Sequence, residues 1–194
     1  MSRGIVARKP RAAPAAEPAR FRFRRPLPYV DPQARPGGVR RALAGAASGA
    51  LPRWLATTRI WRLTVWRAEP HLQRLSGGRL STAAGLPVAL LETRGARTGQ
   101  WRGHGVIYFH DGDRVTIIAS QAGYPGHPAW YYNLLANPDV RLGGERFAAR
   151  AVTDEAERRR LWGLADQVFP AFADYRRSAA RHGRPIPVIQ LTRS

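Results

Sequence analysis

Apolar residues follow a helical spacing in the first part of this chain and form short continuous runs in the second. The sequence of residues 51–67 predicts an amphipathic helix. One helical face would hold Leu51, Trp54, Leu55, Thr58, Trp61 and Val65, while Arg53, Arg59 and Arg67 lie largely elsewhere. Beyond residue 85, apolar runs at 87–91, 105–109 and 115–119 predict β-strands. The chain therefore changes from helical to strand-rich near residue 85.

Turn-forming residues separate the predicted strands. Asp111-Gly112 supplies the residues that a tight primed turn needs, so the second and third strands are predicted to form a hairpin. Gly143-Gly144 predicts a second hairpin, whose strands lie at 140–142 and 146–152.

Helices and a last strand complete the predicted elements. Pro128 begins a helix that ends at Asn137-Pro138, and one of the two residues at 153–154 caps the next helix. Pro170 restarts the chain into a further helix, and the apolar run at 185–191 predicts a closing strand. Hairpins with helices between them indicate an α+β domain with a largely antiparallel sheet.

Composition and charge divide the chain. It has 194 residues and a net charge of +19, but residues 1–80 hold 17 basic and 3 acidic side chains, which is most of the excess. We predict a disordered basic arm rich in proline and alanine at 1–41, an amphipathic helical region at 42–84 and the folded domain at 85–194.

Several kinds of chemistry are excluded by composition. The chain has no cysteine, so disulfides, thiolate metal sites and a cysteine nucleophile are absent. The five histidines show no metal-ligand spacing, and we predict no metal site. No apolar stretch reaches the length of a membrane span, and no signal peptide is recognisable, so we expect a cytoplasmic protein. The helix expected at 51–67 would dock either on the protein's own core or at the inner face of the plasma membrane.

Three segments are candidates for binding. The loop at 95–102 has glycines that expose backbone N–H groups, a threonine hydroxyl and two arginines that can hydrogen-bond phosphate oxygens. The alternative interpretation is a solvated loop without a binding role. Residues 119–123 are small apart from one glutamine, so a flat ligand could approach their backbone, although they could equally be a plain exit from a strand. The aromatic cluster at 130–132 could wall a ring or belong to the core.

Taken in order, these segments and their neighbours resemble a known family. The matching stretches are LSGGRLSTAAGLPVALLETRG, GARTGQWR, IIASQAG, HPAWYYNLLANP, TDEAERRRLW and FPAFADYRRSAARHGRPIPVIQL. Over roughly 140 residues this series is similar to the deazaflavin-dependent nitroreductase family, a branch of the split β-barrel flavin-binding fold. The resemblance implies an α+β fold, a split β-barrel of about six mostly antiparallel strands with flanking helices.

The same resemblance implies coenzyme F-420, an 8-hydroxy-5-deazaflavin with an anionic tail, in preference to FMN. Arginine and threonine side chains of the first loop would hold its phosphate and tail, and residues of the later segments would line the ring and ribityl chain. The implied cofactor-binding residues are Arg97, Thr98, Arg102, His104, Gly105, Val106, Ala119, Ser120, Gln121, Ala129, Trp130, Tyr131, Asn133 and Phe172. Ser120 and Tyr175 are the implied catalytic residues, which would polarise the acceptor or relay a proton.

The implied activity is transfer of a hydride from the reduced cofactor to a hydrophobic acceptor such as a quinone, an enone or a nitro compound. Phe169 and Phe172 stand where the best-known members carry tyrosines, and Gln121 and Ala96 stand where basic residues are common. Two other functions stay open: a non-enzymatic barrel that binds a lipid, and salt-dependent nucleic-acid binding by the arm, without sequence specificity. The chain is expected to be a monomer or a homodimer.

Overall fold

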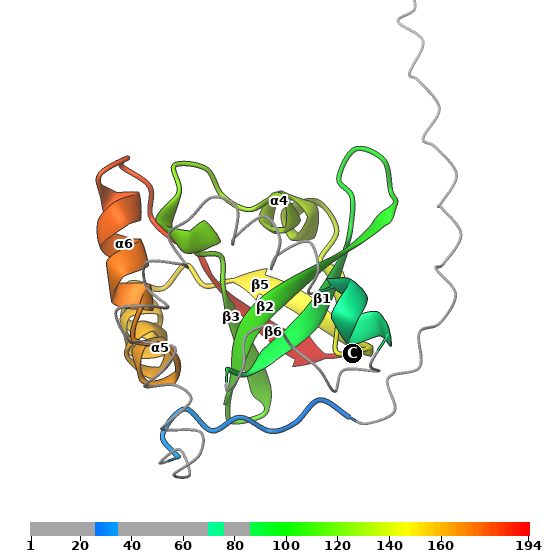
Figure 1. The fold of residues 1–194 in the computed structure, drawn as a ribbon, viewed down its shortest axis with the longest axis horizontal. Coiled ribbons are helices and arrows are strands. Elements are labelled where there is room, and N and C mark those ends of the chain that lie inside the picture. Colours follow the sequence, from blue (N-terminus) through cyan, green and yellow to red (C-terminus); the bar gives the residue numbers. More distant parts are fainter. Residues whose placement is uncertain (1–25, 35–69, 76–85) are drawn as a thin grey trace, which may run out of the picture.

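The computed structural model describes residues 26–34, 70–75 and 86–194. Within them, six strands close an antiparallel barrel in the order β1-β2-β3-β6-β5-β4 (Figure 1). The strands are β1 (Val88–Arg94), β2 (Trp101–Asp111), β3 (Arg114–Ile118), β4 (Asp139–Leu142), β5 (Glu145–Ala151) and β6 (Val188–Arg193). The expected α+β class and six-stranded split barrel are confirmed.

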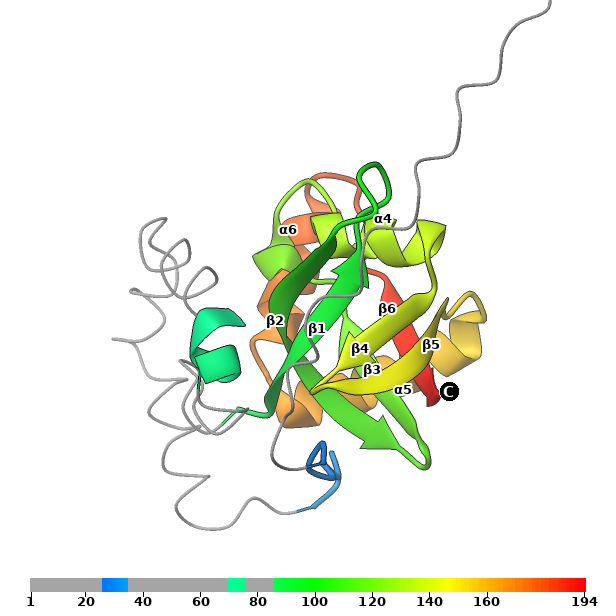
Figure 2. The same ribbon diagram turned by 90° about the vertical axis from the view of Figure 1, so that its right-hand side faces the viewer.

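Helical segments flank this barrel. They are η1 (Gln121–Gly123), α4 (Ala129–Ala136), α5 (Glu155–Val168) and α6 (Phe172–Ala180). In two views at right angles, α4 lies across one end of the barrel, and Figure 1 places α5 and α6 along its side (Figures 1 and 2). The end covered by α4 is therefore bordered by helices and by the loop between β1 and β2.

The predicted hairpins and cap are confirmed, although the first hairpin turns at Gly112-Asp113, one residue later than predicted. Gly112 has φ +63° between β2 and β3, and Gly143 and Gly144 have φ +57° and +84° between β4 and β5. Of the two candidate caps, Asp154 starts α5, because its carboxylate accepts the Glu157 N–H at 2.7 Å. These local signals were sufficient because each one satisfies the backbone with residues close in sequence.

The closing strand begins later than predicted. The apolar run was expected to form a strand from 185, but β6 begins at Val188. Pro185 and Pro187 have no N–H to donate to a neighbouring strand, which explains the difference. Pro187 still accepts a hydrogen bond from the Ala119 N–H at 3.0 Å, so the chain runs beside β3 before β6 begins.

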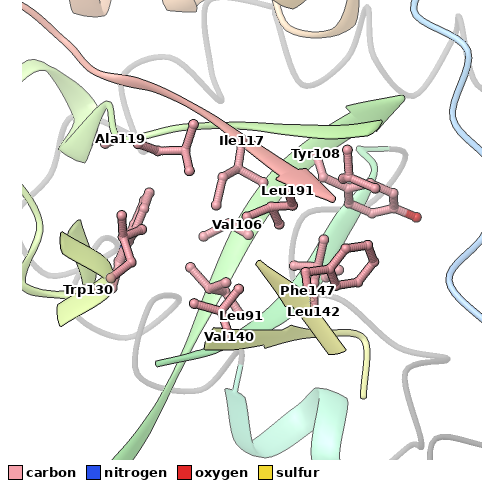
Figure 3. Packing of buried hydrophobic residues seen from close by; sticks show 14 of the residues in the cluster. Leu91, Val106, Tyr108, Ile117, Ala119, Trp130, Val140, Leu142, Phe147 and Leu191 are labelled. Carbon is pink, nitrogen blue, oxygen red and sulfur yellow. The ribbon is translucent and has the colours of Figure 1, made fainter. Parts of the chain in front are cut away.

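Apolar side chains from all six strands fill the barrel interior. Figure 3 shows Ala119 and Trp130 at one end of this interior and Tyr108 and Phe147 at the other, with Val106 between them. A second apolar cluster lies outside the barrel wall, where α5 and α6 cover outward-facing residues of β2, β3 and β6. The two clusters use opposite faces of the same strands, as the alternation of strand side chains requires.

Little of the predicted helical region at 42–84 is described, and the helix predicted at 51–67, with its membrane contact, lies outside the described residues. Residues 70–75 are helical and lie against β1: the Gln73 side chain donates to the Val88 carbonyl at 3.2 Å, and Arg74 pairs with the buried Glu92 at 3.1 Å. A bilayer-spanning helix, which needs both length and sustained apolarity, does not occur among the described residues.

Residues 26–34, hereafter the strap, lie against the end of the barrel opposite α4 (Figure 1). The Leu27 N–H donates to Glu145 at 2.7 Å, and the Tyr108 hydroxyl donates to the Pro28 carbonyl at 3.0 Å. Val30 and His110 exchange two hydrogen bonds, from the Val30 N–H to His110 Nδ1 at 3.0 Å and from the His110 N–H to the Val30 carbonyl at 2.8 Å. Sequence analysis placed these residues in the arm and did not predict the contacts.

We expect Leu27→Ala to lower the free energy of unfolding by about 2 kcal/mol, because Leu27 is only 8% exposed and belongs to the interior cluster. Its Cδ1 lies 2.9 Å from the position that a Cβ on Gly143 would occupy, so its side chain fills the space over the β4–β5 turn. Urea unfolding measures the change, with the exposed Gln33→Ala as the control. Equal stability of the two variants would show that the strap contributes nothing to the fold.

Candidate functional site

The three candidate segments meet at the end of the barrel that α4 covers. They are the loop between β1 and β2, the turn that follows β3, and α4 itself (Figure 1). Two buried polar side chains, Asn133 and Arg184, connect them by hydrogen bonds. Segments far apart in sequence are thereby held together at this end of the barrel, hereafter the mouth.

The loop between β1 and β2 is closed by its own backbone. The Gly95 N–H donates to the Gln100 carbonyl and the Gly99 N–H to the Gly95 carbonyl, both at 2.8 Å. A Cβ on Gly95 would lie 2.8 Å from Thr98 Oγ1 and 3.2 Å from the Gln100 carbonyl oxygen, so the tight loop leaves little room for a side chain there. Arg97 and Arg102 are exposed and make no ion pair with any described residue. Both guanidinium groups are free to bind an anion.

Asn133 fastens this loop to α4. Its side chain is buried; Nδ2 donates to Thr93 Oγ1 at 3.1 Å and Oδ1 accepts the Ala96 N–H at 3.0 Å. The family resemblance implied that Asn133 lies beside the cofactor. In the structure, both the oxygen and the nitrogen of its side-chain amide hydrogen-bond other groups of the protein. Its role here is to hold the loop in place.

The turn after β3 has an uncommon backbone. Gln121 and Ala122 have φ +45° and +51°, and the Gly123 and Tyr124 N–H groups donate to the Ser120 and Gln121 carbonyls, both at 3.0 Å. Two successive left-handed residues other than glycine cost free energy, and such strain is typical of functional sites. Ser120, a predicted catalytic residue, is buried at the start of this turn.

Arg184 lies behind the turn and was missed by the sequence analysis. It is 7% exposed, and its guanidinium donates to the Ser120 carbonyl at 2.7 Å and to the Ala119 carbonyl at 3.4 Å. It also contacts His127 Nδ1 at 3.2 Å; because arginine can only donate, this nitrogen must accept. The only local signal is an arginine between Gly183 and Pro185, which does not indicate burial.

His104 faces the barrel interior. It lies opposite Leu91 in the register of β1 and β2, and Leu91 belongs to the interior cluster. Its Nε2 atom is buried and has no hydrogen-bond partner among the described residues. Burial first, and the nearby Arg102 second, lower the pKa of His104, so the ring is neutral at pH 7. A buried, unpartnered nitrogen in the mouth fits a ligand with a polar edge.

The remaining predicted residues do not all lie inside the barrel. Val106, Ala119 and Trp130 belong to the interior cluster. Gly105 lies opposite Leu90 on the other face of β2, and Ala129 is exposed. Tyr131 is half-buried, with its ring 4.9 Å from that of His127.

Phe172 lies in the outer cluster, with its ring 5.1 Å from that of Phe169 and 6.2 Å from that of Tyr175. Tyr175 adjoins the strained turn through its backbone, because a Cβ on Gly123 would lie 2.7 Å from its carbonyl oxygen.

The stability of the protein is expected to fall on mild acidification. Burial is the largest cause that lowers the pKa of His104, His110 and His127, aided by Arg102, Arg193 and Arg184 respectively; at His110, Glu145 opposes the shift. The unfolded chain therefore binds more protons than the folded one just below pH 6.5, the ordinary value for histidine. This contribution to stability is complete above pH 6.5 and decreases as pH falls toward the folded-state values.

Urea unfolding at pH 7.5, 6.5 and 5.5 measures this dependence. We expect His110→Gln to flatten it, because the variant removes the ring that must accept the Val30 N–H. A free energy of unfolding that stays constant over this range would contradict the prediction.

Comparison with known proteins gives concordant matches. Residues 65–193 match the family model described as F420H(2)-dependent quinone reductase. The F420H(2)-dependent quinone reductase Rv1261c of Mycobacterium tuberculosis is 35% identical over 150 residues, covering 74% of this chain and 98% of the relative.

Two solved structures are also similar to this chain. One, a domain-swapped dimer, is 29% identical with a TM-score of 0.50 and covers 64% of this chain and 93% of its own. The other, an F420-H2 dependent reductase (FDR-A), is 33% identical with a TM-score of 0.47, over 54% and 93% of the two chains.

Proposed function

Because the chain belongs to the F420H(2)-dependent quinone reductase family, we propose that it is an oxidoreductase that passes a hydride from reduced coenzyme F-420 to a quinone. The observation that carries the proposal is the composition of the barrel mouth. Two exposed guanidinium groups without ion-pair partners among the described residues stand at its rim, and the buried, unpartnered His104 Nε2 lies inside. An anionic group at the rim and a polar ring edge inside would satisfy both.

The residues present fit this cofactor. Arg97 and Arg102 would hold the anionic phosphate and tail, since guanidinium groups form paired, charge-assisted hydrogen bonds with such oxygens. The apolar side chains of Val106, Ala119 and Trp130 would shield the ring from water. Reduced coenzyme F-420 supplies the hydride when bound. The neutral His104 side chain would hydrogen-bond the polar edge of the ring.

The proton that accompanies the hydride is assigned to hydroxyl groups of the chain. Ser120 lies in the strained turn at the mouth, and Tyr175 adjoins that turn from α6. We assign to these two hydroxyls the polarisation of the acceptor and the relay of the proton.

Incubation of the purified chain with reduced coenzyme F-420 and a soluble naphthoquinone tests the function. We expect the cofactor's fluorescence to change on binding and its oxidation to depend on the quinone. An enone and a nitroarene run in parallel define the range of acceptors, and reduced FMN serves as the cofactor control. The proposal fails if saturating coenzyme gives neither a fluorescence change nor a thermal shift.

Removing both rim charges is expected to weaken binding of the cofactor selectively. In Arg97→Gln/Arg102→Gln we expect the Kd for coenzyme F-420 to rise about tenfold or more, since charge-assisted hydrogen bonds are worth about 1.5–3 kcal/mol each before solvent screening. The Kd for the tail-less deazariboflavin should change little, because it lacks the phosphate and the acidic tail. Arg181→Gln, an exposed arginine just after α6, is the matched control. Equal weakening for both ligands would place the two arginines elsewhere than at the tail.

A further inference from the structure

Arg184 is a buried cation without a counter-ion in the described part of the chain. The hydrogen-bond partners of its guanidinium group there are all neutral: the carbonyls of Ala119 and Ser120, and the ring of His127. Its Nε atom is also buried and has no hydrogen-bond partner among the described residues. Burying a charge without an opposite charge costs several kcal/mol, so the fold tolerates this arginine at a cost.

The guanidinium group holds two of the three segments that border the mouth. Through Ser120 it fixes the start of the strained turn, and through His127 it reaches the residues just before α4. The His127 ring in turn lies 4.9 Å from that of Tyr131 and 5.9 Å from that of Tyr132 on α4. One side chain therefore sets the separation between the turn and the helix.

The turn needs such a support. Gln121 and Ala122 adopt left-handed conformations that a free chain seldom populates, and only surrounding contacts can maintain them. On the side of α6, Gly123 packs directly against Tyr175 and Ser178. At its start, Arg184 holds the Ser120 carbonyl that also accepts the Gly123 N–H.

On these observations, and resting on the proposed function, we propose that Arg184 is a positioning residue: its forked guanidinium holds the Ser120–Gly123 turn and the start of α4 in the arrangement that binds the deazaflavin ring. The role depends on the fork, because one planar group must reach two carbonyls and an imidazole at once. A lysine would keep the positive charge but could not span the three acceptors.

The test compares Arg184→Lys and Arg184→Met with the wild type and with Arg181→Met, a matched substitution of an exposed arginine. The first readout is amide hydrogen exchange without cofactor. We expect exchange at Gly123 and Tyr124 to accelerate at least tenfold in the Met variant and by less in the Lys variant, while amides of β3 and β6 keep their rates. The second readout is the Kd for oxidised coenzyme F-420, which should rise in the same order and by at least tenfold for Met.

Either of two results overturns the role. The first is an exchange rate and a Kd in Arg184→Met that equal those of the wild type; if the Met variant does not fold, the same result in Arg184→Lys counts. The second is an acceleration of amide exchange spread evenly over the barrel, because it would show that Arg184 only stabilises the fold as a whole. Failure of the proposed function is distinguishable, because the wild type itself would then bind no coenzyme F-420. The exchange data without cofactor would still decide whether Arg184 holds the turn.

Discussion

Gly123→Ala is expected to lower the free energy of unfolding by about 3 kcal/mol or more and to abolish binding of coenzyme F-420 at micromolar concentrations. Gly123 has φ +77°, where an alanine is strained. The new Cβ would lie 2.7 Å from the Tyr175 carbonyl oxygen, 2.7 Å from the Ser178 Cβ and 3.1 Å from the Tyr175 Cα. Two of these three atoms belong to the backbone of α6, so no rotation of a side chain can relieve the clash.

The clash can be relieved only if α6 and the turn move apart, and movement of either one changes the candidate site. Displacement of the turn moves Ser120, and displacement of α6 moves Tyr175, so both predicted catalytic residues depend on this contact. Urea unfolding and fluorescence titration with the coenzyme measure the two effects. Gly126→Ala is the control, because Gly126 is exposed and a Cβ there meets nothing within 4 Å. If the two variants behave alike, the close approach of α6 to the turn does not govern the site.

The parts of the fold that sequence analysis predicted correctly are those decided by neighbouring residues. Both expected hairpins form, with turns at Gly112-Asp113 and Gly143-Gly144, because glycine adopts the positive φ that these turns need. Asp154 caps α5 because its carboxylate reaches an N–H three residues ahead. Apolar runs predicted the strands, but two of them begin elsewhere than expected. β2 begins at Trp101, four residues before the run at 105–109, because Trp101 and Arg102, predicted in the loop, pair with β1. The prolines before Val188 delay the start of β6.

The strap and Arg184 could not be predicted in this way. Leu27 lies among prolines with no periodic pattern, and its burial depends on Gly143 and Glu145, more than a hundred residues away. Arg184 likewise has its acceptors about sixty residues earlier in the chain. Neither residue has a local pattern that distinguishes it from an exposed one, because long-range contacts alone bury it.

The candidate site was predicted from the sequence only in part. The resemblance selected the three segments that the structure brings to one mouth, although no spacing in the sequence shows that they meet. The roles of individual residues were harder to predict. Asn133 and Phe172 were both expected beside the cofactor. The Asn133 amide instead hydrogen-bonds Thr93 and Ala96, and Phe172 lies in the outer cluster. Whether these and the other predicted residues touch the cofactor stays a prediction.

Asn133→Ala is expected to lower the free energy of unfolding by about 2–3 kcal/mol, because it leaves buried polar groups without partners. The Thr93 hydroxyl, fully buried, would lose the Asn133 Nδ2 donor, and the Ala96 N–H would lose its acceptor. Asn137→Ala, one turn further along, is the matched control. The Asn137 amide makes a longer hydrogen bond of 3.3 Å to the Arg94 carbonyl and is only half-buried, so its loss should cost about 1 kcal/mol or less.

The same substitution should weaken binding of the coenzyme, because Asn133 anchors the loop that carries Arg97. Without the anchor, ordering that loop becomes part of the cost of binding, and we expect the Kd for coenzyme F-420 to rise about tenfold. The Kd for the tail-less deazariboflavin should rise less, since it makes no use of the rim arginines. A fall in stability with an unchanged Kd for the full coenzyme would separate the anchor from the site, and the β1–β2 loop would then have no part in holding the anionic tail.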